Sequence, residues 1–134
     1  MRPNAALSLA VFASLIAVAA CGAGSKAPAC PQSFPIPPQM VIPAPGATAV
    51  PVNTGMEVSY SGDIAAWSAP TLVPSKGGSV VIGSPFALVP TPGPIVYSSN
   101  LPALQSGTTY SVQLRTPPSG SCQALAQLGS FTTQ

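Results

Sequence analysis

Charge is the scarcest property of this sequence. Only 4% of its 134 residues are charged, and histidine is absent. Without histidine, the chain cannot assemble a Ser-His-Asp or Cys-His catalytic site, and it lacks the commonest metal ligand. Beyond residue 20 the cations are Lys26, Lys76 and Arg115, which are too few and too scattered to neutralise the phosphates of a nucleic acid. These shortages exclude several enzyme classes and argue against a nucleic-acid partner.

Carboxylates are equally scarce, because Glu57 and Asp63 are the only two in the chain. A glycosidase that works with two carboxylates would have to use this pair. Glu57 lies in an alternating segment that directs it outward, and Asp63 follows Gly62 in an expected turn, so we expect both to be exposed to solvent. Two carboxylates also fall short of a metal shell. We therefore expect no catalytic site, no metal and no cofactor.

Proline, glycine and apolar residues are abundant instead. The chain has 18 prolines and 12 glycines, and 46% of its residues are hydrophobic. The proline and glycine content favours short elements separated by turns, whereas the hydrophobic content is too high for a disordered chain. A length of 134 residues allows one domain and a short appendage. Together these features predict a single all-β domain.

The first 20 residues have the plan of a signal peptide. Arg2 supplies a basic start, and residues 5–20 are apolar except for two serines. This apolar run of 16 residues is shorter than the roughly 20 residues that a membrane-spanning helix needs, and it ends in small side chains. We therefore expect residues 1–20 to be a signal peptide that is removed on export.

Four residues at the end of this segment resemble the lipobox of bacterial lipoproteins: Val18, Ala19, Ala20 and Cys21. The resemblance implies that Cys21 becomes the first residue and carries a diacylglycerol and an acylated amine, enough chains for stable anchoring in a membrane. Ordinary secretion is the alternative, because Ala17 and Ala19 also form a small-x-small cleavage site. Gly22 rather than aspartate follows, so the family's sorting rule favours the outer membrane or cell surface, with the periplasmic side left open.

Two cysteines remain once the resemblance assigns Cys21 to the lipid, namely Cys30 and Cys122. Two thiols in an exported chain predict one disulfide. Residues 22–38 hold five prolines and show neither helical nor strand periodicity. We therefore expect residues 21–38 to form a lipidated, Pro-rich tether, which at about 3.1 Å per residue would span roughly 50 Å.

Short runs of β-forming residues separated by turn signals fill residues 39–134. The expected strands cover residues 40–42 with a continuation through 46–52, then 56–61, 71–73, 79–82, 95–98, 109–114 and 129–133. Alternation in 56–61 directs Met56, Val58 and Tyr60 toward the core. Residues 75–78 indicate a hairpin whose glycines supply positive φ. About seven strands predict an antiparallel β-sandwich.

Three segments resemble bacterial immunoglobulin-like domains of the surface-layer and fibronectin-like kind: residues 45–54, 104–112 and 131–133. The middle segment looks like their tyrosine-corner strand, formed by Leu104, Gly107 and Tyr110. The resemblance implies that the Tyr110 hydroxyl bonds the backbone a few residues upstream. Val112 stands where antibody domains have a cysteine, so their intersheet disulfide is absent. For residues 39–134 the resemblance implies an immunoglobulin-like sandwich with a structural, adhesive or protein-interaction role in the envelope.

Residues 84–94 combine four prolines with three large apolar residues, Phe86, Leu88 and Val89. So many prolines argue against an interior strand. If the apolar side chains pack inward, the segment is a stiff crossover between the sheets, and we favour this interpretation. If they are exposed, they form the best candidate interaction surface.

The expected partners are a membrane, through the lipid anchor, and an envelope protein or polysaccharide. A small-ligand or carbohydrate-binding module is the alternative function. Exposure of Trp67, Tyr97 and Phe86 on one face would support that alternative, because sugar rings stack on aromatic side chains.

Overall fold

The computed structural model describes residues 30, 35–119 and 122–134. The expected signal peptide, the lipobox-like residues, Cys21 and most of the tether lie outside the described residues. No helix in the described part of the chain is long and apolar enough to cross a membrane.

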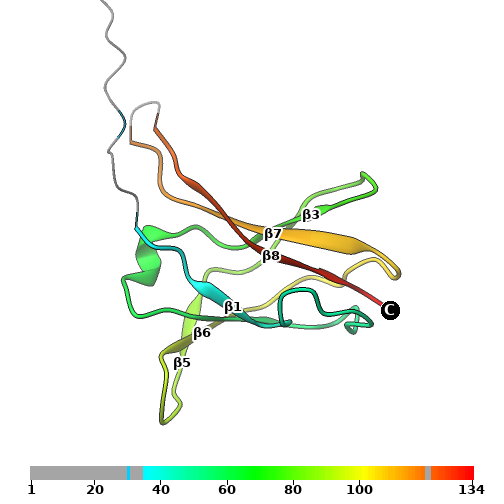
Figure 1. Ribbon diagram of the computed structural model, residues 1–134, viewed down its shortest axis with the longest axis horizontal. Helices are drawn as coiled ribbons and strands as arrows, with labels where there is room; N and C mark the ends of the chain where they lie inside the picture. Colours follow the sequence, from blue (N-terminus) through cyan, green and yellow to red (C-terminus); the bar gives the residue numbers. More distant parts are fainter. Residues whose placement is uncertain (1–29, 31–34, 120–121) are drawn as a thin grey trace, which may run out of the picture.

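Two four-stranded antiparallel sheets form the domain (Figure 1). In spatial order the first sheet contains β1 (Gln39–Ile42), β2 (Met56–Ser59), β6 (Val96–Ser99) and β5 (Ala87–Val89). The second contains β4 (Val81–Ile82), β3 (Thr71–Pro74), β7 (Thr109–Arg115) and β8 (Leu125–Thr132). A short 3-10 helix, η1 (Ile64–Ala66), lies between β2 and β3. The predicted all-β sandwich is confirmed.

The core lies between the sheets and follows the alternation of the sequence. On β2, Met56 and Val58 are buried while Glu57 and Ser59 are only half-buried, which confirms the expected inward face. Tyr60 follows β2 and is half-buried, and its hydroxyl accepts a hydrogen bond from Trp67 Nε1 at 3.3 Å. One cluster of buried residues joins the sheets: Met40, Val50, Met56, Val58, Leu72, Leu104, Tyr110, Val112 and Phe131.

The β3–β4 connection is the predicted hairpin. Thr71 pairs with Ile82 and Leu72 with Val81 in antiparallel register. Gly77 and Gly78 have φ of 77° and 116°, so the turn uses the positive φ that glycine adopts at little steric cost. The strand after the turn is shorter than expected, because only two residues of 79–82 pair.

The prediction that a strand continues through residues 46–52 is wrong. Gly46 and Ala49 have φ of 80° and 55°, values that bend the backbone out of the extended conformation. Val50 forms only an isolated parallel bridge with Thr133. The segment instead covers the edge of β8, since Gly46 N–H donates to the Ser130 carbonyl at 2.7 Å. It thereby protects the end of an edge strand from pairing with another chain.

Candidate functional site

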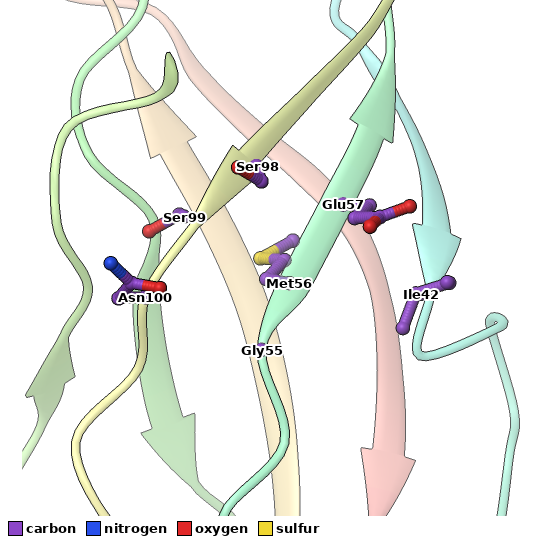
Figure 2. Close-up of a pocket in the computed structure, with 7 residues that line it drawn as sticks. All are labelled: Ile42, Gly55, Met56, Glu57, Ser98, Ser99 and Asn100. Atoms are coloured by element: carbon purple, nitrogen blue, oxygen red, sulfur yellow. The ribbon is translucent and has the colours of Figure 1, made fainter. Parts of the chain in front are cut away.

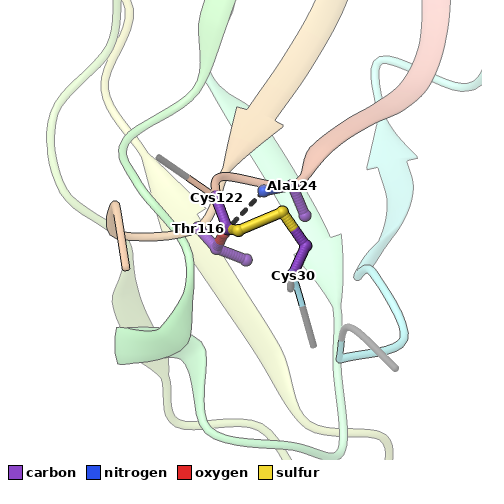
Figure 3. The surroundings of a disulfide bond; sticks show 4 residues. All are labelled: Cys30, Thr116, Cys122 and Ala124. Atoms are coloured by element: carbon purple, nitrogen blue, oxygen red, sulfur yellow. Dashed lines mark hydrogen bonds between the residues drawn. A yellow bond between two sulfur atoms is a disulfide. The ribbon is translucent and has the colours of Figure 1, made fainter. Parts of the chain in front are cut away.

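A disulfide joins Cys30 to Cys122, as the cysteine count predicted (Figure 3). The two residues are 92 positions apart, and their Cα atoms lie 5.4 Å apart. Cys122 is buried in the connection between β7 and β8, whereas Cys30 is exposed. The bond therefore attaches the segment before the domain to one end of the second sheet.

Thr116 organises the turn that holds Cys122. Its backbone N–H donates to the Ala124 carbonyl at 3.0 Å. Its Oγ1 accepts from the Ala124 N–H at 2.9 Å, the bond that Figure 3 marks with a dashed line. Ser119 and Cys122 exchange a further pair of backbone hydrogen bonds at 2.8 and 3.0 Å. Thr116 is itself buried, so this network fixes the position of the disulfide relative to the sheet.

Tyr110 makes the hydrogen bond expected of a tyrosine corner. Its ring is buried beside Phe131, with 5.9 Å between the ring centroids, and its hydroxyl accepts from the Gln105 N–H at 2.9 Å. Leu104 is buried in the core cluster, and Gly107 turns the chain with φ of 60°. These contacts close the loop before β7, which gives the residues a structural role.

Residues 84–94 are partly a crossover and partly an edge strand. Ser84 starts the connection from the second sheet to the first, and residues 87–89 form β5 at the edge. Phe86 is half-buried and packs against the core, as the crossover interpretation requires. Leu88 is 62% exposed and Val89 is half-buried. Phe86 is therefore a poor contact residue, and Leu88 is the apolar side chain that this segment presents.

The register of the first sheet explains why Leu88 is exposed. Leu88 pairs with Tyr97, and Tyr97 pairs with Val58, so the three side chains share the inner face of the sheet. Val58 is fully buried, whereas Tyr97 is half-buried. The second sheet therefore covers less of the inner face of the first sheet toward the β5 edge. Leu88 thus has the orientation of a core residue without a full set of neighbours.

The structure does not provide the aromatic face that would support the alternative of carbohydrate binding. Trp67 is only 6% exposed. Phe86 and Tyr97 are half-buried and pack against the hydrophobic core. The ring faces needed for stacking on a sugar are therefore not presented together by these three residues.

The Glu57 carboxylate lies near a shallow hollow of about 240 Å³ at the end of β2 and β6 (Figure 2). Its other lining residues are Ile42, Gly55, Met56, Ser98, Ser99 and Asn100. Glu57 pairs across the sheet with Ser98, on the face opposite the core residue Met56. The lining offers one carboxylate with hydroxyls and an amide, and no second titratable side chain to complete an acid–base pair.

Asp63, the other carboxylate, has a local structural role. Its Oδ1 accepts a hydrogen bond from the Ala65 N–H at 2.9 Å and so caps η1. Among the described residues, no three Cys, Asp or Glu side chains gather in a way that could hold a metal ion.

Two further hollows border the segment that leads into β1. They share Ile36, Pro37 and Gln39, and one of them also reaches Leu128 on β8. Ile36 is 82% exposed, the most exposed large apolar side chain of the described residues. Sequence analysis did not single out this residue, because an isolated isoleucine among prolines carries no periodic signal.

No family model matches the chain, and no curated protein or solved structure matches it either.

Proposed function

We propose that this protein is a lipid-anchored component of a bacterial cell envelope that presents one immunoglobulin-like domain and has a structural or protein-interaction role without catalysis. The observation that carries the proposal is the sequence Val18–Cys21 at the end of a signal-peptide-like segment. The disulfide between the two remaining cysteines supports export, because such bonds persist in oxidising compartments.

The order of the strands supports the immunoglobulin-like part of the proposal. Such domains place their first, second, fifth and fourth strands in one sheet and the others in the second, with an extra strand in some members. Here β1, β2, β6 and β5 form one sheet and β4, β3, β7 and β8 the other, which is the same arrangement if β4 is the extra strand. Tyr110 lies at the start of β7, where the tyrosine corner is expected.

The scarcity of titratable side chains supports a role without catalysis. The sequence has no histidine and two carboxylates, one of which caps η1. Glu57 has only neutral residues around its hollow. General acid–base chemistry usually needs a second titratable group within reach of the substrate.

Exposed apolar residues on one edge strand of each sheet support an interaction role. Ile82 on β4 is 64% exposed, and Val80 just before it is 48% exposed. Leu88 on β5 is 62% exposed. These strands are edges of different sheets, and exposed apolar side chains at sheet edges are typical of protein contacts.

Replacement of Cys21 by serine tests the anchor. We expect Cys21→Ser to move the protein from the detergent phase to the aqueous phase, because two or more acyl chains, and not the sandwich, hold it at the membrane. The matched control is the double variant Cys30→Ser/Cys122→Ser, which keeps Cys21 and should stay in the detergent phase. Equal partitioning of Cys21→Ser and the native protein would overturn the lipoprotein assignment and favour ordinary secretion.

A further inference from the structure

We infer that the disulfide orients the domain on the lipid surface, with the end that holds Cys122 facing the lipid and the opposite end facing away. The outward end comprises the hairpin tip at Lys76, the turn at Gly107 and the C-terminal Gln134. The inference rests on the proposed lipid anchor at Cys21, and it adds to that proposal which surface an envelope partner can reach.

The length of chain between the anchor and the disulfide is short. Cys30 is nine positions after Cys21. A chain reaches at most about 3.6 Å per residue, so the Cα of Cys30 stays within about 32 Å of the lipidated residue, whatever its backbone conformation. Without the disulfide, the first buried residue among those that the structure describes is Pro38, 17 positions after Cys21, and the same limit rises to about 60 Å. The disulfide thus halves the reach of the tether.

The attachment point on the domain is firm. Cys122 is 4% exposed, and the hydrogen bonds between Thr116 and Ala124 hold its turn against the end of β7. The tether that ends at Cys30 therefore restrains the position of the second sheet itself, because the disulfide is fixed to that sheet.

The β7–β8 pair separates the two ends of the domain. Arg115 pairs with Leu125 near the disulfide, whereas Thr109 pairs with Thr132 at the other end. At about 3.3 Å per residue, the seven residues of β7 span roughly 20 Å. The far end also holds the hairpin tip, because Ser75 N–H donates to the Thr109 carbonyl at 2.9 Å. Figure 1 shows the C-terminus at the end opposite the entry of the chain.

The end near the disulfide also presents apolar side chains that suit the boundary of a membrane. Leu125 is 55% exposed and Ile36 is 82% exposed. Arg115 is exposed there, but η1 and its capping residue Asp63 lie toward the same end, since Ser68 N–H donates to the Arg115 carbonyl. The opposite charges cancel in part, so attraction to headgroups adds little and the short tether is the main cause of the orientation.

Lysine labelling of the full lipidated protein can measure this orientation. The mature chain contains only two lysines, Lys26 and Lys76. The variant Lys26→Arg leaves Lys76 as a single site at the outward end. The variant Lys26→Arg/Lys76→Arg/Arg115→Lys moves the single site to the disulfide end with the same net charge. A third variant, Lys26→Arg/Lys76→Arg, has no lysine and reports any labelling of the α-amino group.

Each variant is labelled with an amine-reactive donor and reconstituted into phosphatidylcholine–phosphatidylethanolamine vesicles that carry a headgroup acceptor of short Förster distance. We expect severalfold more energy transfer from position 115 than from position 76, after the signal of the lysine-free variant is subtracted. When Cys30→Ser/Cys122→Ser is introduced into each labelled variant, energy transfer from position 115 should fall, and the difference in transfer between positions 115 and 76 should become smaller. Reduction of the native disulfide should do the same, and this measurement stands even if the double serine variant folds poorly.

The outcomes separate this inference from the function on which it rests. If the protein floats with the vesicles but transfer is equal from both positions, or greater from position 76, the inference is overturned and the anchor stands. A difference that persists unchanged after reduction also overturns it, because the disulfide would not be its cause. If the protein does not float with the vesicles, the anchor and the orientation both fail.

Discussion

The hydroxyl of Tyr110 accepts a hydrogen bond from the backbone amide of Gln105 over 2.9 Å and so ties the loop before β7 to the core. Gln105 is exposed, so water can replace the lost partner when the hydroxyl is removed. We expect Tyr110→Phe to lower the free energy of unfolding by about 1 kcal/mol, the usual net contribution of one hydrogen bond. Denaturant midpoints would measure the change.

Tyr97→Phe is the matched control for this prediction. Tyr97 also packs against the core, although it is half-buried where Tyr110 is fully buried, and within the described part of the chain no hydrogen bond of its hydroxyl is present. Its removal should leave the unfolding midpoint nearly unchanged. Equal effects of the two variants would show that the hydrogen bond to Gln105 does not stabilise the loop.

A second prediction concerns Gly83, where the chain leaves β4 for the first sheet. A Cβ at this position would lie 2.6 Å from Ser99 Oγ and 2.8 Å from Pro70 Cγ. The backbone is held in place because Gly83 N–H donates to the Pro70 carbonyl at 2.9 Å. We therefore expect Gly83→Ala to destabilise the domain by about 2 kcal/mol, as overpacking of a tightly packed site does.

Gly55→Ala provides the comparison, since its added Cβ would lie 3.7 Å from the Ser99 carbonyl oxygen, an ordinary contact. It should change the unfolding free energy by less than about 0.5 kcal/mol. Thermal or urea unfolding of both variants decides the matter. A Gly83→Ala protein as stable as Gly55→Ala would mean that the crossover is not tightly packed.

The sequence predicted most reliably those strands in which alternation coincides with burial. In residues 56–59 every second side chain is buried, and the expected inward face is correct. Residues 109–114, which were expected to form a strand, show the same alternation of burial. Residues 46–52 looked equally suited to a strand, but the positive φ of Ala49 has no signature in the residue type. Residues 87–89 were not predicted as a strand, because prolines stand close on both sides of them and a three-residue edge strand is too short to show a period.

The candidate site was predictable to the extent that it depends on residue identity alone. Once the resemblance to a lipobox had set Cys21 aside, counting cysteines was enough to pair Cys30 with Cys122. Which of Phe86 and Leu88 is exposed could not be predicted from the sequence, because it depends on how far the second sheet covers the β5 edge. That cover is a property of tertiary packing, and no local pattern encodes it.

A third prediction follows from this contrast between Phe86 and Leu88. Phe86 is half-buried against the core, so Phe86→Ser should cost about 2 kcal/mol, less than the 3–5 kcal/mol of a fully buried phenylalanine. Leu88 is 62% exposed, and Leu88→Ser should change stability by less than about 0.5 kcal/mol. Urea titrations of the two variants would show the difference. Equal losses would mean that residues 84–94 pack differently from the structure.

The last prediction concerns the disulfide, measured in a Cys21→Ser background so that lipid does not affect unfolding. For a separation of 92 residues, the chain-entropy relation gives about 4–5 kcal/mol of stabilisation. We expect a loss nearer 2–4 kcal/mol on removing the bond, roughly the typical range, because exposed Cys30 belongs to a segment before the folded core.

The bond can be broken by mutation or by reduction. Comparing the two separates the stability that comes from the cross-link from the effect of changing the buried residue at position 122. The variant Cys30→Ser/Cys122→Ser removes the bond but also buries a serine hydroxyl at position 122, where the native cysteine is only 4% exposed. Chemical reduction of the native disulfide removes the bond and leaves both thiols in place. If the two routes give equal losses of unfolding free energy, the loss belongs to the cross-link. A larger loss for the serine variant would assign the excess to an unsatisfied hydroxyl beside Thr116. No loss by either route would show that the link contributes nothing to folding, and its effect would then be confined to the reach of the tether.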